Sequence, residues 1–436
     1  MWSDKPRMGL VAAYAPMEVG WQEAPRLLEQ AHAALKGLPL DVVPVLRPVF
    51  DVPTALQAAE ALSKAHVEAV VWLAATWAHD SLAVDFLRSC PVPLVAWGIP
   101  GMDTGSLCGS QQLVEVLTEL GHPREFVHGP IDHADVQAHI MSAARASAAA
   151  SRLKKARFGM LGHRTIGMME VTFHEYDLFE QFGALVRFKG ADELRAAMDA
   201  ANAGDAGAIW AQTKSRCGLC NADDVSGVTA ARCYLALRAW IETDRLAGIA
   251  VGCYPDLMGI ACLACGWLAE EGIVTSCEGD MNSLILTAAM HLMSGQPVHN
   301  TDLLFADEHD NTCTMSHCGS SAISLAGDAK SVRLERVRLM EHGVAAHYSG
   351  VPGRVTIANL CGRKGTYRLT RYTGEAVPTG MVFPGIPVKV RLDAPLERFL
   401  RETADFGTGH HWMVAYGDLS RPLDQFARMT HLKIFP

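Results

Sequence analysis

The sequence of 436 residues lacks long apolar runs, charged tails, internal repeats and low-complexity segments. No stretch approaches the roughly 18 apolar residues of a membrane span. The longest candidate, residues 258–269, ends at Glu270 and Glu271. The net charge of −9 argues against a nucleic-acid partner, which would need a basic surface. The first residues are charged and lead into a strand-like run instead of a signal-peptide core, so we expect a cytoplasmic protein without membrane contact.

Signatures of several enzyme classes are also missing. The chain has no Gly-x-Ser-x-Gly and no phosphate-binding Gly-Lys-Ser/Thr. The segment 162–167 (GHRTIG) follows an expected strand, but it lacks the full glycine fingerprint and the downstream acid of a nucleotide loop. The sequence therefore gives no positive sign of nucleotide binding or of a serine nucleophile.

The 12 cysteines are many, but they lie in apolar runs instead of at disulfide-like loop spacings. In a long chain without an export signal we expect reduced thiols. Two pairs, Cys217 with Cys220 and Cys262 with Cys265, have the spacing of a structural zinc site. The second pair lies in an apolar stretch typical of a buried helix, where cysteine behaves as a small hydrophobic residue. We expect both pairs to serve packing.

Alternating strand and helix patterns dominate the first two thirds of the chain. A content of 49% hydrophobic and 19% charged residues is typical of a folded protein, and the length favours two or three domains. Expected strands at 8–13, 42–45, 67–73 and 92–97 alternate with helices at 23–36 and 55–65, which predicts a parallel sheet flanked by helices. A second alternating unit begins at residue 157, after a small-residue helix that ends in basic residues.

From Val332 onward the pattern changes to period two. The segments 332–339, 353–358, 365–369 and 386–392 alternate apolar and polar residues and are separated by Gly and Pro, which predicts an antiparallel sheet or small barrel. The predicted fold class is therefore α/β, with two Rossmann-like parallel-sheet domains and a C-terminal antiparallel, barrel-like β domain. The predicted domains are 1–155, 156–300 and 301–436, with Glu278 in the second.

Carboxylates and imidazoles gather in two segments. Glu278 lies in residues 275–282 (TSCEGDMN), Asp302 and His317 follow, and residues 407–412 (GTGHHW) add His410 and His411. This ligand set suits Mn²⁺, Fe²⁺, Co²⁺ or Zn²⁺. A divalent ion with open positions can polarise a carbonyl, and two carboxylates beside it can move protons. This equipment is typical of a metal-dependent aldose–ketose isomerase.

Each of these residues also has an ordinary structural interpretation. Glu278 and Asp280 could simply begin the helix that follows, as acidic residues often do. Three nearby acids could take the role given to Asp302; they are Asp307, Glu308 and Asp310. His317 could be a hydrogen-bonded core residue. Of His410 and His411, one is expected to point away from the site, and residue chemistry alone does not choose between them.

The same residues resemble the L-fucose isomerase and L-arabinose isomerase superfamily, especially its shorter members. The similarity lies in Cys277 and Glu278, in 295–298 (GQPV), and in Asp302 with 311–319 (NTCTMSHCG). It continues in 162–170 (GHRTIGMME), in 407–411 with the later 416–418 (YGD), and more loosely in 70–79 (VVWLAATWAH). The chain is short for the superfamily, and its second acid is Asp, as in fucose isomerases.

The resemblance implies Mn²⁺ held by Glu278, Asp302 and a C-terminal histidine, for which we place His410 slightly before His411. It also implies His317 as a ligand in the arabinose-type members, and homo-oligomers, hexamers or trimers, with active sites between subunits. We expect Arg164, Met168, His317 and Asp280 to contact the substrate. Arg164 could meet an anionic group, although a surface arginine is an equal interpretation.

The predicted function is metal-dependent isomerisation of an open-chain monosaccharide, with Glu278 and Asp302 moving the proton. The sugar is expected to be a pentose, a deoxy sugar or an anionic or sulfonated sugar. Two alternatives stay open. One is a non-catalytic sugar-binding protein, which would need no metal. The other is a metal-dependent epimerase or lyase on the same scaffold.

Overall fold

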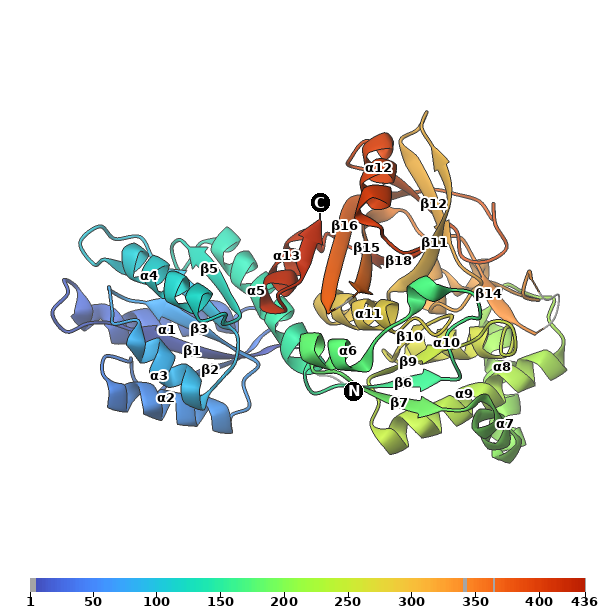
Figure 1. Cartoon of the computed structure of the whole chain (residues 1–436), viewed down its shortest axis with the longest axis horizontal. Coiled ribbons are helices and arrows are strands. Elements are labelled where there is room, and N and C mark those ends of the chain that lie inside the picture. The colour runs from blue at the N-terminus through green and yellow to red at the C-terminus, as the bar shows by residue number, and fades with distance from the viewer. Residues whose placement is uncertain (1–4, 340–342, 364, 436) are drawn as a thin grey trace. The chain divides into compact units, whose positions relative to one another are not determined.

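The computed structural model describes residues 5–339, 343–363 and 365–435 (Figure 1). Tertiary contacts divide the chain into two compact units. The smaller contains the chain up to Arg152 together with Arg421–His431, and the larger contains Leu153–Ser420 and the last residues from Leu432. The three-domain boundaries proposed from the sequence stay a prediction.

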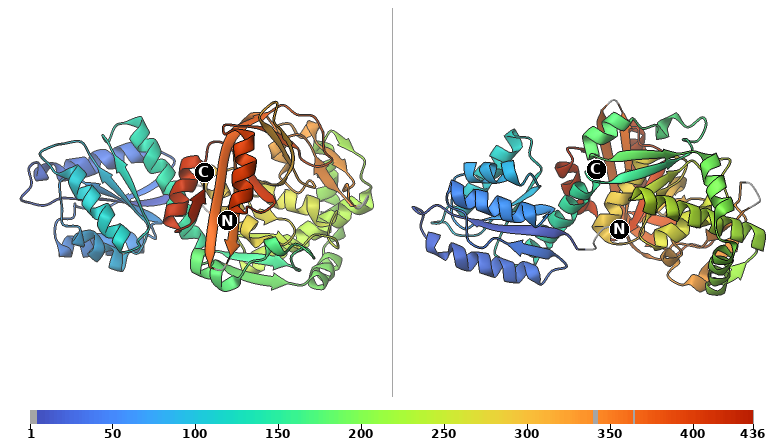
Figure 2. Two further views of the ribbon diagram at one scale, coloured as in Figure 1. Left: turned by 45° about the horizontal axis from the view of Figure 1, so that its top comes forward. Right: turned by 90° about the horizontal axis from the view of Figure 1, so that it is seen from below.

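The smaller unit is a parallel five-stranded sheet in the order β2-β1-β3-β4-β5. Figure 2 shows helices on both faces of this sheet. The central strands are buried along their whole length, which is why they read as continuous apolar runs. The elements are β1 (Arg7–Ala13), α1 (Ala24–Lys36), β2 (Asp41–Pro44), α2 (Val52–Lys64), β3 (Ala69–Ala74), α3 (Ser81–Ser89), β4 (Leu94–Gly98), α4 (Ser106–Glu119), β5 (Arg124–His128) and α5 (Ala134–Leu153), with a 3-10 turn η1 (Trp21–Glu23).

Helix α13 (Ser420–Met429) returns from the C-terminal part of the chain to this smaller unit. Arg428 of α13 pairs with the buried carboxylate of Glu125 on β5 at 2.8 Å. Ser142 of α5 also donates a hydrogen bond to Gln425. The unit is therefore completed by residues far away in the sequence.

The larger unit contains a parallel four-stranded sheet in the order β10-β9-β6-β7. Its strands end at the same edge, which brings the loops after β6, β9 and β10 together. Helix α11 contacts both this sheet and strands β15 and β18 of the next sheet (Figure 1). The elements are β6 (Arg157–Leu161), α6 (Glu175–Phe182), β7 (Leu185–Lys189), α7 (Ala191–Ala200), α8 (Ala203–Arg216), α9 (Asp224–Asp244), β9 (Gly248–Val251), α10 (Ala261–Glu270), β10 (Val274–Ser276) and α11 (Met281–Ser294).

A seven-stranded sheet follows in the order β15-β18-β11-β12-β17-β16-β19. Strand β15 pairs with both β18 and β16, so the first six strands close into a barrel-like ring, and β19 adds in parallel to β16. Large side chains such as Phe399 and Trp412 fill its core. The elements are β11 (His299–Asp307), β12 (Thr312–Ser316), β15 (Gly353–Arg363), β16 (Thr366–Val377), β17 (Val388–Leu392), α12 (Leu396–Phe406), β18 (His411–Tyr416) and β19 (Lys433–Phe435).

The predicted fold class is confirmed: two parallel α/β sheets and a mostly antiparallel, barrel-like sheet. A small sheet in the order β14-β13-β8 was not expected; it joins β8 (Leu219–Cys220), β13 (Arg333–Glu335) and β14 (Ala345–His347), beside the turns η3 (Ile323–Ala326) and η4 (Ala329–Ser331). Cys262 and Cys265 lie buried on α10 within apolar clusters. Among the described helices, none combines the length and apolarity that crossing a membrane requires.

Candidate active site

Glu278 lies in a tight turn between β10 and α11. Its backbone has φ 60, a left-handed conformation that non-glycine residues adopt only at a cost. Gly279 follows with φ 70, and a Cβ there would lie 2.7 Å from the Cα of Arg164. The carbonyl of Glu278 accepts a 3.0 Å hydrogen bond from the amide of Thr165. The loop after β6 therefore holds Glu278 in place, as expected for a residue whose orientation serves a function.

The barrel brings Asp302 and His411 onto the same face. Asp302 on β11 pairs directly with His411 on β18 and with Ser316 on β12, and residues opposite each other in an antiparallel pair point the same way. His411 Nε2 lies 3.9 Å from Asp302 Oδ1 and 3.3 Å from Glu278 Oε2. The acid after β10 and the acid on β11 thus meet at one imidazole.

Asp280 holds His411 from behind. Its Oδ2 lies 2.9 Å from His411 Nδ1, and its Oδ1 accepts a hydrogen bond from the amide of Ser283 as the N-cap of α11. Burial alone would raise the pKa of Asp280, but the hydrogen bond with His411 lowers it. Burial alone would lower the pKa of His411, but Asp280 and Glu278 raise it to about 10. With Nδ1 engaged, Nε2 is directed at the two acids.

His410 lies beside His411, with ring centroids 3.9 Å apart. Its Nδ1 bonds Glu170, a residue of η2 (Met169–Val171), and its Nε2 lies 3.4 Å from Glu278 Oε2. Burial would lower the pKa of His410, but Glu170 and Glu278 raise it to about 9. Burial would raise the pKa of Glu278, but the adjacent imidazoles of His410 and His411 hold it well below its usual range.

Glu170 is the site residue that sequence reasoning missed. It stands at the end of the segment 162–170 that resembles the fucose and arabinose isomerases, so the signal was present. Its contact with His410 joins the loop after β6 to the start of β18. These segments are far apart in the sequence, so only the folded chain reveals the contact.

His317 completes the group. It is 3% exposed, its ring centroid lies 5.8 Å from that of His411, and its Nδ1 is buried. Burial would lower the pKa of His317, but the Cys318 side chain and the carboxylate of Asp302 raise it. The competing acids Asp307 and Asp310 lie near the hairpin between β11 and β12, where Asp310 pairs with Lys389 at 3.3 Å.

The donor atoms fit a divalent cation. Two overlapping groups, Glu278/His410/His411 and Asp302/His317/His411, each place their ligand atoms within 4.8 Å of one another. Four of these atoms are buried without a hydrogen-bond partner among the described residues: Glu278 Oε2, Asp302 Oδ1, His317 Nδ1 and His411 Nε2. Buried polar atoms are normally satisfied, and mixed carboxylate and imidazole sets suit Mn²⁺ and related ions. The pairing of His411 with Asp280 is the arrangement that orients metal-bound histidines.

The residues predicted to contact the substrate occupy different positions. Arg164 donates from Nη1 to the carbonyls of Thr165 at 3.2 Å and Met168 at 3.1 Å, so its guanidinium folds over its own loop. Asp280 is buried behind His411, and its predicted contact with substrate stays a prediction. A cavity of about 250 Å³ begins at Glu170 and Gly409 and extends to His174 and Arg368.

Curated proteins with similar sequences are sulfoquinovose isomerases. One from Alkalicoccus urumqiensis is 24% identical over 379 residues, which cover 84% of this chain and 85% of that protein. One from Priestia megaterium is 25% identical over 391 residues with the same coverage, and one from a Clostridium species is 25% identical over 358 residues, or 79% and 80%. No model of a known protein family matches. The similarity supports the predicted enzyme class: the chain is an isomerase of the aldose–ketose type.

Solved structures give no further guidance. A solute-binding protein of an ABC transporter from Burkholderia multivorans matches with 14% identity and a TM-score of 0.20, covering 67% of this chain and 94% of that protein. A TM-score of this size supports no conclusion about fold or function.

Proposed function

We propose that this protein interconverts a sulfonated aldose and the corresponding ketose with the help of a divalent cation, Mn²⁺ in the first instance. The observation that carries the proposal is the convergence of two acids and three imidazoles, of which Glu278, Asp302, His317 and His411 each place there a buried atom with no hydrogen-bond partner among the described residues. The finer kinship, with fucose and arabinose isomerases, is part of the same proposal.

Glu278, Asp302 and His411 would hold the cation, with His317 and His410 next to them. His411 is preferred to His410 because Asp280 fixes its ring with Nε2 toward both acids, whereas His410 is turned toward Glu170. When bound, the ion would polarise the carbonyl of the open-chain sugar and stabilise negative charge on the neighbouring oxygen. His317 is close enough to Asp302 and His411 to be either a fourth ligand or a contact to substrate hydroxyls.

Proton transfer would fall to the two carboxylates. Glu278 is ionised and held by a constrained turn, so it can take the proton from C2 of the aldose and return it to C1 of the enediol. Asp302 faces the same space from β11 and would relay the hydroxyl proton between the two oxygens. Because Glu278 lies in the turn after β10 and Asp302 lies on β11, one acid can serve the two carbons of the enediol while the other serves its two oxygens.

The names of the curated relatives suggest a sulfonated substrate, and the guanidinium of Arg164 is a positively charged group that could bind the sulfonate. Arg164 precedes Thr165, whose amide binds the Glu278 carbonyl, so Arg164 lies at the edge of the site. Among the described residues, Nη1 of its guanidinium donates hydrogen bonds to Thr165 and Met168, and guanidinium has five donors in all. We assign the anionic end of the sugar to this side of the site.

Self-association is part of the proposal as well. Several large apolar side chains between Ile166 and Phe188 are exposed, and this stretch contains Glu170; they are Ile166, Met169, Tyr176, Phe179, Leu185 and Phe188. Exposed apolar residues that gather on one surface commonly mark protein–protein contacts, and we propose that these residues do so. Light scattering coupled to gel filtration should give a mass that is a multiple of the mass of a single chain. The mass of one chain would reject the proposed self-association.

The substrate is tested by incubating the purified protein and Mn²⁺ with sulfoquinovose and with neutral aldoses, followed by product analysis. The expected result is a sulfonated ketose, with little turnover of neutral sugars. Arg164→Ala should raise KM for the sulfonated sugar more than kcat changes. Equal turnover of neutral pentoses or 6-deoxyhexoses would reject the sulfonate assignment, and formation of an epimer or a cleavage product would reject isomerisation.

A further inference from the structure

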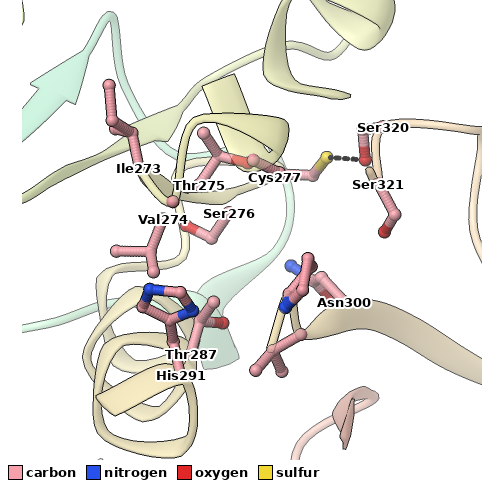
Figure 3. A pocket seen from close by; sticks show the side chains of 14 residues that line it. Ile273, Val274, Thr275, Ser276, Cys277, Thr287, His291, Asn300, Ser320 and Ser321 are labelled. Atoms are coloured by element: carbon pink, nitrogen blue, oxygen red, sulfur yellow. Dashed lines mark hydrogen bonds between the residues drawn. The ribbon is translucent and has the colours of Figure 1, made fainter. Parts of the chain in front are cut away.

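A second cavity adjoins the segments that carry the two acids. It is lined by the end of β10 with Cys277, by Thr287 and His291 of α11, by Asn300 of β11 and by Ser320 and Ser321 (Figure 3). Its inner space measures about 20 Å³. This exceeds the roughly 10–15 Å³ that one water molecule requires and is far too small for a sugar.

Asn300 is the unusual residue of this cavity. It is 4% exposed, and neither its Oδ1 nor its Nδ2 has a hydrogen-bond partner among the described residues. Figure 3 shows its side chain in the space between Thr287 on one side and Cys277 and Ser320 on the other. A buried amide without partners is unfavourable, whereas one or two water molecules can satisfy both its donor and its acceptor.

The opposite walls can bind the same water. Cys277 Sγ and Ser320 Oγ lie 3.1 Å apart, and Ser276 Oγ donates to the Asp280 carbonyl at 2.7 Å. Thr287 Oγ1 donates to the sulfur of Met413 at 2.9 Å. Each hydroxyl here makes one hydrogen bond and retains unused lone pairs. The cavity is therefore polar on several sides, which is the condition for a stably held internal water.

The cavity touches strand β11, which carries Asp302, and the residue that precedes Glu278 in its turn. Asn300 and Asp302 are two residues apart on β11, so their side chains project from the same face. On the other wall, Cys277 immediately precedes Glu278, and Ser276 holds the carbonyl of Asp280. We propose that Asn300 is a positioning residue that binds ordered water in this cavity, and that the water joins the strand of Asp302 to the turn of Glu278. The expected effect of Asn300 on catalysis rests on the proposed function, whereas the presence of the water does not depend on it.

The test combines a high-resolution crystal structure with Mn²⁺ titration and kinetics. In the wild type, a water is expected within hydrogen-bonding distance of the Asn300 amide. Asn300→Leu, which keeps the shape and removes the polar atoms, should lose this water, weaken Mn²⁺ binding about tenfold or more, and lower kcat with little change in KM. Asn300→Ser, which keeps a hydroxyl and leaves room for water, should recover most of both losses.

Thr312→Val is the matched control. Thr312 Oγ1 on the same barrel is also buried and has no hydrogen-bond partner in the described part of the chain, but Thr312 does not line the cavity. It should leave Mn²⁺ affinity and kcat unchanged. A dry cavity in the wild type, or wild-type Mn²⁺ affinity and kcat in Asn300→Leu, would overturn the proposal. If Asn300→Leu does not fold, the Mn²⁺ affinity and kcat of Asn300→Val and the electron density of the wild-type cavity test the proposal instead. A wild type that binds Mn²⁺ but isomerises no sugar would reject the proposed function alone. The electron density for the water and the Mn²⁺ affinities of the variants would still test the role of Asn300.

Discussion

The Nδ1 atom of His411 lies 2.9 Å from Oδ2 of Asp280, the residue that also caps the N-terminus of α11. One carboxylate thus joins the helix that follows Glu278 to the barrel strand that follows His410. Because the contact leaves Nε2 of His411 as its only free ligand atom, the orientation of the proposed cation site depends on Asp280.

Asp280→Asn tests this dependence. Asparagine is an equally good N-cap, but it removes the negative charge that faces the buried imidazolium of His411, so the metal-free protein should lose stability. The weaker hydrogen bond to His411 should also reduce Mn²⁺ affinity roughly 10- to 100-fold. Isothermal titration calorimetry measures the affinity. Ser283→Ala is the control, since it removes a hydroxyl bonded to Asp280 at 2.5 Å and leaves His411 in place. Equal Mn²⁺ affinity in Asp280→Asn and wild type would show that His411 is not a ligand.

Asp302→Asn should preserve the fold and reduce kcat by roughly 10²- to 10⁴-fold, the range expected for loss of a proton-transferring group. Asp307→Asn should have kcat close to wild type, because Asp307 lies near the far end of the β11–β12 hairpin. Steady-state kinetics of both variants decides the matter. The reverse ranking would mean that the wrong acid of this strand has been chosen.

Gly279→Ala should destabilise the protein through two effects. Alanine is strained at φ 70, which costs about 1–2 kcal/mol, and its Cβ would lie 2.7 Å from the Cα of Arg164. Gly295→Ala is the control, because Gly295 also has φ 70 but no atom lies within 4 Å of an added Cβ. Chemical denaturation should show the larger loss for Gly279→Ala, together with lower activity through displacement of Glu278. Equal losses in the two variants would show that the turn tolerates the side chain.

The two adjacent histidines predict a pH dependence in the metal-free protein. The folded-state pKa values of His410 and His411 are raised from 6.5 to about 9 and about 10. Their contribution to stability is therefore fully present below pH 6.5 and is lost as the pH rises through about 9 to 10. The Tm of the metal-free protein should fall over this interval. A Tm that stays constant or rises between pH 7 and 10 would mean that these histidines are neutral.

The same pKa values predict that metal binding releases protons. Imidazole must be neutral to bind a cation, so Mn²⁺ affinity should increase with pH until about pH 10. Calorimetry in buffers of different ionisation enthalpy counts the protons released. Binding without proton release near pH 7 would place the cation elsewhere than at His411.

Much of the fold follows from local patterns. The helix α1 was expected because apolar residues recur at helical spacing, and Leu28, Ala31 and Leu35 are among its buried residues. The period-two segments after Val332 predicted the antiparallel region, and β15, β16 and β17 lie there. The strands β11 and β12 were missed; in β11 three buried residues are followed by half-buried and exposed ones, so residues 299–307 do not alternate cleanly.

The sequence predicted which residues gather at the site better than it predicted how they are arranged. The segments around Glu278, Asp302, His317 and His410–His411 all reach one place in the fold. The choice between the two histidines depends on where β18 begins and on the register that pairs His411 with Asp302, and neither is encoded locally. For the same reason the sequence could not reveal that Glu170 contacts His410, or that the buried Asn300 amide has no hydrogen-bond partner among the described residues.

The most direct test of the central claim is incubation of the purified protein with Mn²⁺ and sulfoquinovose in D₂O. The account predicts formation of the sulfonated ketose and deuterium at C2 of the aldose recovered at equilibrium, both lost in Glu278→Gln. A protein that binds Mn²⁺ yet gives neither ketose nor exchange with this or any other aldose would contradict it.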